Sequence, residues 1–109
     1  MAGFHSGTDI VASYQSPVLA AQNGIVVFVG MLPIRGMTVI LDHGWGIYTG
    51  YSHLAATSIE SGGQVFAGQT VGLVGSTGRS TGSHLHLELR VHNIPIDPVP
   101  WLTQDIFGS

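Results

Sequence analysis

The chain has 109 residues, the size of one domain, and should bury roughly two-thirds of the surface of its unfolded form. Only 8% of its residues are charged, its three cations are all arginines, and its formal net charge is −3. So few cations argue against nucleic acid or an anionic membrane as the partner, and the absence of cysteine excludes disulfides and thiolate metal sites. Sixteen glycines and many β-branched residues predict an all-β fold with numerous turns.

The first half of the chain predicts short strands separated by turns. Strands are expected at 18–21, 25–29, 37–41 and 47–53. The apolar run at 25–29 is typical of a strand buried on both faces. A tight turn with glycines at positions 44 and 46 separates the last two strands. A turn or two of helix is expected at 54–59.

The clearest strand lies at 84–91, after a loop rich in glycine, serine and threonine. Polar and apolar residues alternate through it without a break, in the order H-L-H-L-E-L-R-V. A period of two is typical of a strand with one buried and one wet face, so His84 and His86 project to the same side. Very short strands over 62–75 precede it, and a short edge strand at 94–96 follows.

Histidine and carboxylate spacing predicts a zinc site. His5 and Asp9 are four residues apart, which keeps them on one side of the chain, and imidazole with carboxylate suits Zn²⁺. With one of His84 and His86 they would supply three protein ligands and leave one open position, the general form of a hydrolytic zinc site. Spacing does not decide whether one or both of His84 and His86 bind. A histidine that does not bind is well placed for proton transfer.

Other titratable residues have less specific interpretations. His53, at the end of the strand 47–53, is either a further site residue or an ordinary surface histidine. Glu88 shares the face of His86 and could orient its imidazole, although pairing with an arginine at the surface is the preferred interpretation. His43 is expected to have a structural or supporting role, and His92 to lie at the surface. Tyr48 and Tyr51 are expected to be packing groups.

Three segments of the chain match a known signature in order and separation: H-S-G-T-D at 5–9, Y-S-H-L at 51–54 and G-R-S-T-G-S-H-L-H at 78–86. The match also includes D-H-G at 42–44 and D-P at 97–98. Together they resemble the lysostaphin/LytM-type zinc metalloendopeptidases, which cut peptidoglycan. The resemblance covers about residues 4–102. It implies a small antiparallel β-sandwich or split-barrel domain with a groove that holds the metal site.

The resemblance also implies a role for each site residue. His5, Asp9 and His86 would bind Zn²⁺, and His53 and His84 would be the catalytic pair that does not bind it. The implied function is a zinc-dependent endopeptidase that hydrolyses peptide bonds in peptidoglycan cross-bridges or stem peptides with metal-activated water. Which histidine acts as general base remains open at this point.

We expect residues 1–109 to form one catalytic domain that lacks both an upstream segment and a cell-wall-binding module. The loop 75–82 and the Gly44–Gly46 turn are expected to form the walls of the groove. The expected partner is a peptidoglycan peptide, bound by a monomer that neither binds nucleic acid nor inserts into a membrane. The resemblance implies a secreted or cell-envelope location, although the chain shows no signal peptide.

Two other classes of function fit the residues less well. A catalytically weak or inactive relative could bind peptidoglycan or activate a hydrolase, but all five site positions are intact here. A biotinyl or lipoyl carrier needs an acceptor lysine, and the chain has none. A histidine phosphocarrier would leave Asp9 and its spacing from His5 unexplained.

Overall fold

The computed structural model describes residues 7–75, 83–91 and 94–96, and all regular secondary structure in these ranges is β-strand. The strands are β1 (Gly7–Val11), β2 (Pro17–Leu19), β3 (Gly24–Leu32), β4 (Gly36–Asp42), β5 (Ile47–Ala56), β6 (Gln64–Val65), β7 (Thr70–Val74), β8 (His84–Val91) and β9 (Ile94–Ile96). Every pairing between them is antiparallel, so the predicted all-β antiparallel fold is confirmed. These ranges contain no helix that could cross a membrane.

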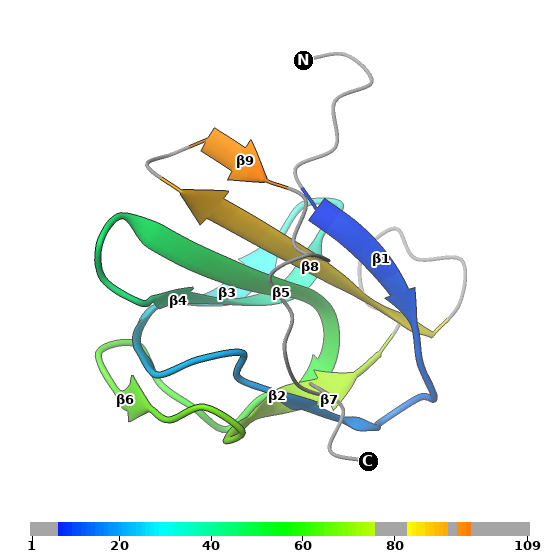
Figure 1. Ribbon diagram of the computed structural model, residues 1–109. Coiled ribbons are helices and arrows are strands. Elements are labelled where there is room, and N and C mark those ends of the chain that lie inside the picture. The colour runs from blue at the N-terminus through cyan, green and yellow to red at the C-terminus, as the bar shows by residue number, and fades with distance from the viewer. Residues whose placement is uncertain (1–6, 76–82, 92–93, 97–109) are drawn as a thin grey trace.

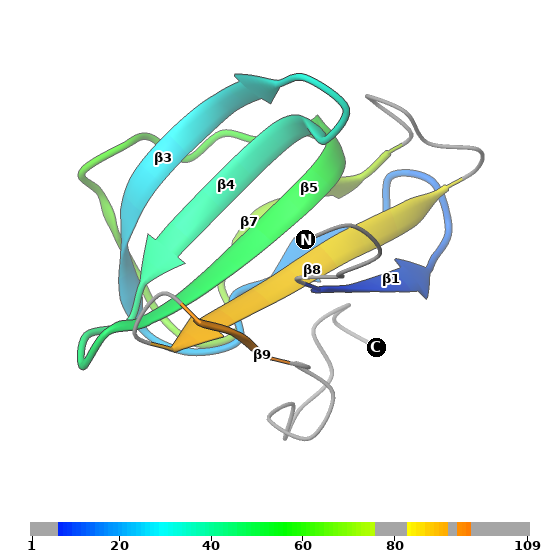
Figure 2. The same ribbon diagram turned by 90° about the horizontal axis from the view of Figure 1, so that it is seen from above.

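The strands form one hydrogen-bonded sheet that folds over on itself. Its main path runs β1-β8-β5-β4-β3-β6, and β7 joins it through β5 while pairing with β2 on its other side. Figure 1 shows β2, β6 and β7 lying beneath the layer of β3, β4, β5 and β8, and Figure 2 shows that layer from above. The two layers are connected because β5 continues beyond its pairing with β8 and pairs Leu54 and Ala56 with Val74 and Leu73 of β7.

The hydrophobic core lies between these layers. On β8 the predicted alternation is present, since Leu85, Leu87 and Leu89 are at most 3% exposed and the residues between them face the other way. Tyr51 and Leu54 of β5 are fully buried in the same cluster. The alternate residues of β8, which point away from this core, are available to form a functional site.

Two local predictions were wrong. The strand over 25–29 is buried on one face only, because Val26 is 1% exposed whereas Ile25 and Val27 are each 44% exposed. No layer of the described chain covers the outer face of β3. The expected helical turn at 54–59 is absent because Leu54–Ala56 continue β5 and pair with β7, and the Thr57 hydroxyl donates to the carbonyl of Val71.

Candidate metal and catalytic site

Three strands bring the predicted site residues together. Asp9 of β1 lies directly opposite His86 of β8, and His86 lies opposite Ser52 on its other side. Directly opposed residues in an antiparallel pair place their side chains on the same face of the sheet. The register therefore joins a carboxylate near the start of the chain to an imidazole 77 residues later.

Asp9 and His86 are in direct contact. Asp9 Oδ1 lies 2.7 Å from His86 Nδ1, and the Asp9 side chain is 64% exposed while that of His86 is 19% exposed. Partial burial would raise the pKa of Asp9, but the hydrogen bond with His86 and the nearby imidazoles outweigh it and hold the pKa below 3.8. Asp9 is therefore a carboxylate at neutral pH.

His86 is flanked by a carboxylate at each of its ring nitrogens. Its Nε2 lies 3.5 Å from Glu88 Oε2, at the outer limit of a hydrogen bond, and its Nδ1 faces Asp9. The interaction with Glu88 raises the pKa of His86 most, partial burial opposes it, and the contact with Asp9 adds to it, so the pKa lies above 6.5. Negative charge on both sides of the ring favours a bound cation, either a proton or a metal ion.

His84 and His53 lie beside this pair. His84 Nε2 is 3.7 Å from Asp9 Oδ1, and the rings of His53 and His84 have centroids 5.0 Å apart. The ring of His53 is also 6.2 Å from that of His86. These three imidazoles and the Asp9 carboxylate therefore form one cluster, and the sequence-based grouping of these four residues matches their placement in space.

A left-handed backbone directs His53 into the cluster. Regular alternation along β5 would place His53 on the face opposite to Ser52, but His53 has a φ of +62°. Its N–H donates to the carbonyl of Arg35, and its own carbonyl accepts from the N–H of Gly75. A non-glycine residue with such a φ costs of order 1 kcal/mol or more, and such strain concentrates at functional sites.

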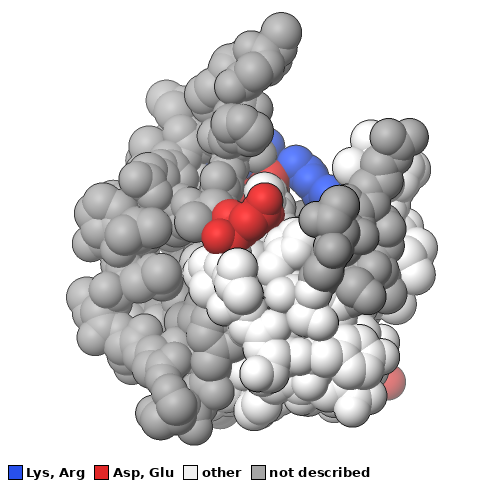
Figure 3. Space-filling model, turned by 90° about the vertical axis from the view of Figure 1, so that its right-hand side faces the viewer, with Lys and Arg blue, Asp and Glu red and all other residues white. Residues whose placement is uncertain are grey.

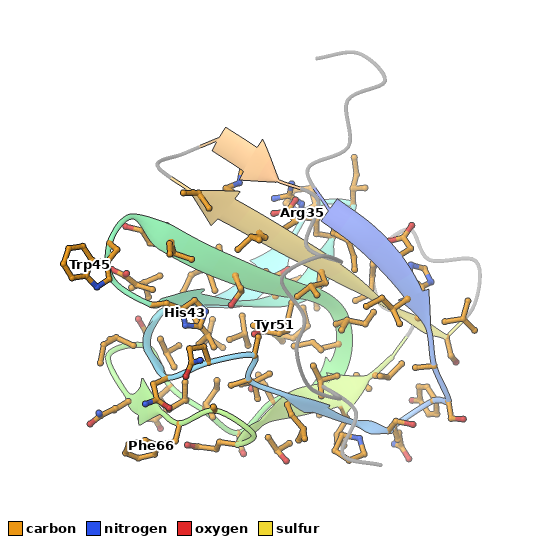
Figure 4. All side chains as sticks on the ribbon, in the orientation of Figure 1. Arg35, His43, Trp45, Tyr51 and Phe66 are labelled. Carbon is orange, nitrogen blue, oxygen red and sulfur yellow. The ribbon has the colours of Figure 1, made fainter. Side chains whose placement is uncertain are left out.

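Which arginine pairs with Glu88 could not be predicted from the sequence, and in the structure it is Arg35. It lies in the turn between β3 and β4, and its Nη2 donates to Glu88 Oε2 at 2.6 Å. Glu88 does pair with an arginine, as predicted, but it is 7% exposed and therefore not at the surface. Among the residues that the structure describes, Figure 3 shows acidic and basic side chains next to one another, and Figure 4 shows Arg35 extending toward β8.

His43 has a structural role at the other end of the sheet. Its Nδ1 donates to the carbonyl of Asn23 at 2.7 Å, and its Nε2 is 2.6 Å from the hydroxyl of Thr49. The Thr49 hydroxyl also contacts the buried hydroxyl of Tyr51, which accepts from the N–H of Ala21. This network ties β5 to the segment between β2 and β3 and to the residue that follows β4. Tyr51 is fully buried, as expected of a packing group.

The predicted groove wall at Gly44–Gly46 is not beside the cluster. This turn precedes Ile47, the first residue of β5, whereas His53 lies near the other end of that strand. At about 3.3 Å per residue the two are separated by roughly 20 Å. Figure 4 shows Trp45, in the middle of the turn, pointing away from the sheet.

Three other predictions lie outside the described residues: those for His5, the loop 76–82 and His92. The described side chains alone contain no set of three that could hold a metal ion. Asp9 and His86 are nevertheless chemically suited to bind zinc, because a carboxylate oxygen and an imidazole nitrogen are both zinc donors. The two atoms lie 2.7 Å apart here.

Comparison with known sequences identifies the family. The profile of peptidase family M23 matches residues 3–98, and the chain belongs to that family. The chain is 42% identical over 106 residues to the DD-carboxypeptidase/endopeptidase Mpg of Neisseria meningitidis serogroup B, covering 92% of this chain and 24% of that protein. It is 40% identical to the peptidoglycan DD-endopeptidase ShyA of Vibrio cholerae, covering 85% and 22%. The chain thus spans about a quarter or less of the length of these curated relatives.

Solved structures share the fold closely. The catalytic domain of the antimicrobial peptidase lysostaphin from Staphylococcus simulans is 32% identical with a TM-score of 0.85, covering 94% of this chain and 81% of that one. A zinc-containing peptidase from Vibrio cholerae is 35% identical with a TM-score of 0.84, covering 94% and 31%. The predicted relationship to lysostaphin-type peptidases is confirmed.

Proposed function

We propose that this chain is a zinc-dependent endopeptidase domain that hydrolyses peptide bonds in peptidoglycan. The observation that carries the proposal is the convergence of Asp9 Oδ1 and His86 Nδ1 to 2.7 Å, with His84 and His53 beside them. Zinc in the similar peptidase from Vibrio cholerae and the peptidoglycan named for ShyA support the metal and the substrate class.

In this proposal Asp9 and His86 hold Zn²⁺ together with His5. Bound zinc supplies Lewis acidity, which makes water more acidic and polarises a carbonyl group. Asp9 is ionised at neutral pH, as a ligand must be, because the imidazoles around it depress its pKa.

His84 and His53 then move protons without binding the metal. His84 directs Nε2 toward Asp9 and is only 17% exposed in its side chain, so it can accept a proton from a nucleophile placed between it and the ligands. His53 lies one ring away at 5.0 Å and can donate to the leaving amine or to a developing oxyanion. The left-handed backbone at His53, held by hydrogen bonds with Arg35 and Gly75, directs this ring toward the cluster.

The bond cleaved is proposed to be a stem-peptide cross-link rather than a glycine bridge, because ShyA and Mpg are both named for activity on DD bonds. A substrate of this kind places the protein in the cell envelope or outside the cell.

Metal content and cleavage test the proposal together. The protein is refolded with zinc, its metal content is measured, and it is incubated with purified stem-peptide cross-links and with oligoglycine. We expect about one zinc per chain and cleavage of the cross-links, and Asp9→Ala should lose both. A protein that binds no zinc would contradict the proposal, and bound zinc without turnover on either substrate would favour a peptidoglycan-binding or hydrolase-activating module.

A further inference from the structure

Arg35 touches two sides of the site at once. Its backbone carbonyl accepts the N–H of His53 at 2.9 Å, and its guanidinium Nη2 donates to Glu88 Oε2 at 2.6 Å. It reaches both from the turn that joins β3 to β4, 53 residues before Glu88 in the chain. A single turn residue therefore connects the segment that carries His53 to the strand that carries His86.

Glu88 stands between Arg35 and His86. The same oxygen, Oε2, that accepts from Arg35 lies 3.5 Å from His86 Nε2. On the opposite side of the imidazole, Nδ1 is 2.7 Å from Asp9 Oδ1. The imidazole of His86 therefore lies between two carboxylates, with Glu88 at Nε2 and Asp9 at Nδ1.

Burial explains why the arginine is needed. The side chain of Glu88 is 9% exposed, and an ionised carboxylate at that depth is costly unless it is paired and hydrogen-bonded. Arg35 supplies the pairing while keeping 39% of its own side chain in solvent. A carboxylate fixed in this way can accept the Nε2–H of an imidazole and so leave the lone pair on Nδ1.

We propose that Arg35 and Glu88 form a positioning pair for His86. Arg35 holds the Glu88 carboxylate against the imidazole, and Glu88 keeps the ring hydrogen on Nε2, so that Nδ1 is directed toward the metal beside Asp9. This inference rests on the proposed zinc site. Neither residue touches substrate, and both act through His86.

Zinc affinity of the full chain, measured by chelator competition, tests the pair. Glu88→Gln should weaken zinc binding by about 10–100-fold, the usual effect of losing a carboxylate behind a metal-binding histidine. Arg35→Ala should weaken it in the same direction, and the double variant should be no weaker than Glu88→Gln alone, because the two residues act as one unit. Arg90→Ala is the matched control, because Arg90 lies on β8 two residues beyond Glu88 and therefore further from His86. This variant should bind zinc like the unmodified protein.

Two further measurements separate positioning from general loss of stability. The thermal midpoint of each metal-free variant shows the temperature range in which it is folded, and affinities are compared within that range. The visible absorption of the protein loaded with Co²⁺ alone reports the donor strength of the ligands, so its bands should shift in Glu88→Gln and remain unchanged in Arg90→Ala. A mere loss of stability would not shift them.

Failure of this inference differs from failure of the zinc site. If the unmodified protein binds no zinc, the proposed function itself is wrong. If it binds zinc and Asp9→Ala does not, but Glu88→Gln and Arg35→Ala bind like the unmodified protein, only the positioning role is overturned. Additive losses in the double variant or an unshifted Co²⁺ spectrum would overturn it as well.

Discussion

Two polar networks lie along β5 and differ in composition. Near its start, His43, Thr49 and Tyr51 contact one another and backbone atoms, with both nitrogens of His43 in contacts of 2.7 and 2.6 Å. Near its end, His53 lies with other titratable side chains around Asp9, which is 64% exposed. The first network pairs its side chains with one another and with backbone groups, and it links β5 to neighbouring segments. The second concentrates imidazoles and carboxylates, which we propose exchange protons or bind a metal, and it leaves the Asp9 carboxylate open to solvent.

The largest expected effect comes from removing His84, the proposed proton-transfer group. In His84→Ala, turnover should fall by about 10²–10⁴-fold while zinc content stays at the level of the unmodified protein, because a positioned acid or base contributes that much and His84 is proposed not to bind the metal. Steady-state cleavage and metal analysis of the same preparation check both parts. Loss of zinc from this variant would mean that the roles of His84 and His86 are reversed.

A substitution in the network near the start of β5 should lower stability and leave the metal site unchanged. His43→Ala removes contacts to Asn23 and to the buried Thr49 hydroxyl, and should lower the free energy of unfolding by about 1–3 kcal/mol. Zinc affinity should not change. Urea denaturation of the metal-free protein measures the first quantity and chelator competition the second. A weakened zinc site in this variant would show that the two networks are coupled.

Alkaline pH should weaken the stabilising contribution of Tyr51, in the network near the start of β5. Burial raises the pKa of the Tyr51 hydroxyl above 10.0, although its contacts with Thr49 and Ala21 oppose the shift. Above pH 10 the unfolded chain therefore loses this proton before the folded chain does, and the contribution to stability, complete below pH 10, is lost as pH rises through the folded pKa. Denaturation between pH 9 and pH 11 should show the decline, and Tyr51→Phe should flatten it.

A small effect is expected beside Arg35. Ile34 is 62% exposed and has a φ of +70°, a conformation that disfavours a β-branched residue. Ile34→Asn should raise the free energy of unfolding by up to about 1 kcal/mol, because asparagine tolerates this conformation. Thermal unfolding checks the gain, and an unchanged zinc affinity serves as the control for the position of Arg35. A loss of stability would mean that the Ile34 side chain contributes packing that exceeds its strain.

Much of the local structure could be predicted because it depends on neighbours in the chain. Alternation in the strand 84–91 placed His84 and His86 on one face and three leucines in the core, and the structure confirms this. The run at 25–29 was misjudged because apolar residues alone do not show whether a second layer will cover their outer face. The helix expected at 54–59 does not form because these residues begin by pairing with β7, a strand distant in the sequence.

The sequence by itself determined which chemical groups the site has: the carboxylate of Asp9, the paired histidines of β8, and His53. Only the tertiary structure decided how they meet. The register that sets Asp9 opposite His86, the left-handed turn of the chain at His53, and the arrival of Arg35 behind Glu88 all depend on pairings between distant strands. Residue types and local spacing fix the first kind of property, whereas the second arises from contacts that form only when the sheet folds over on itself.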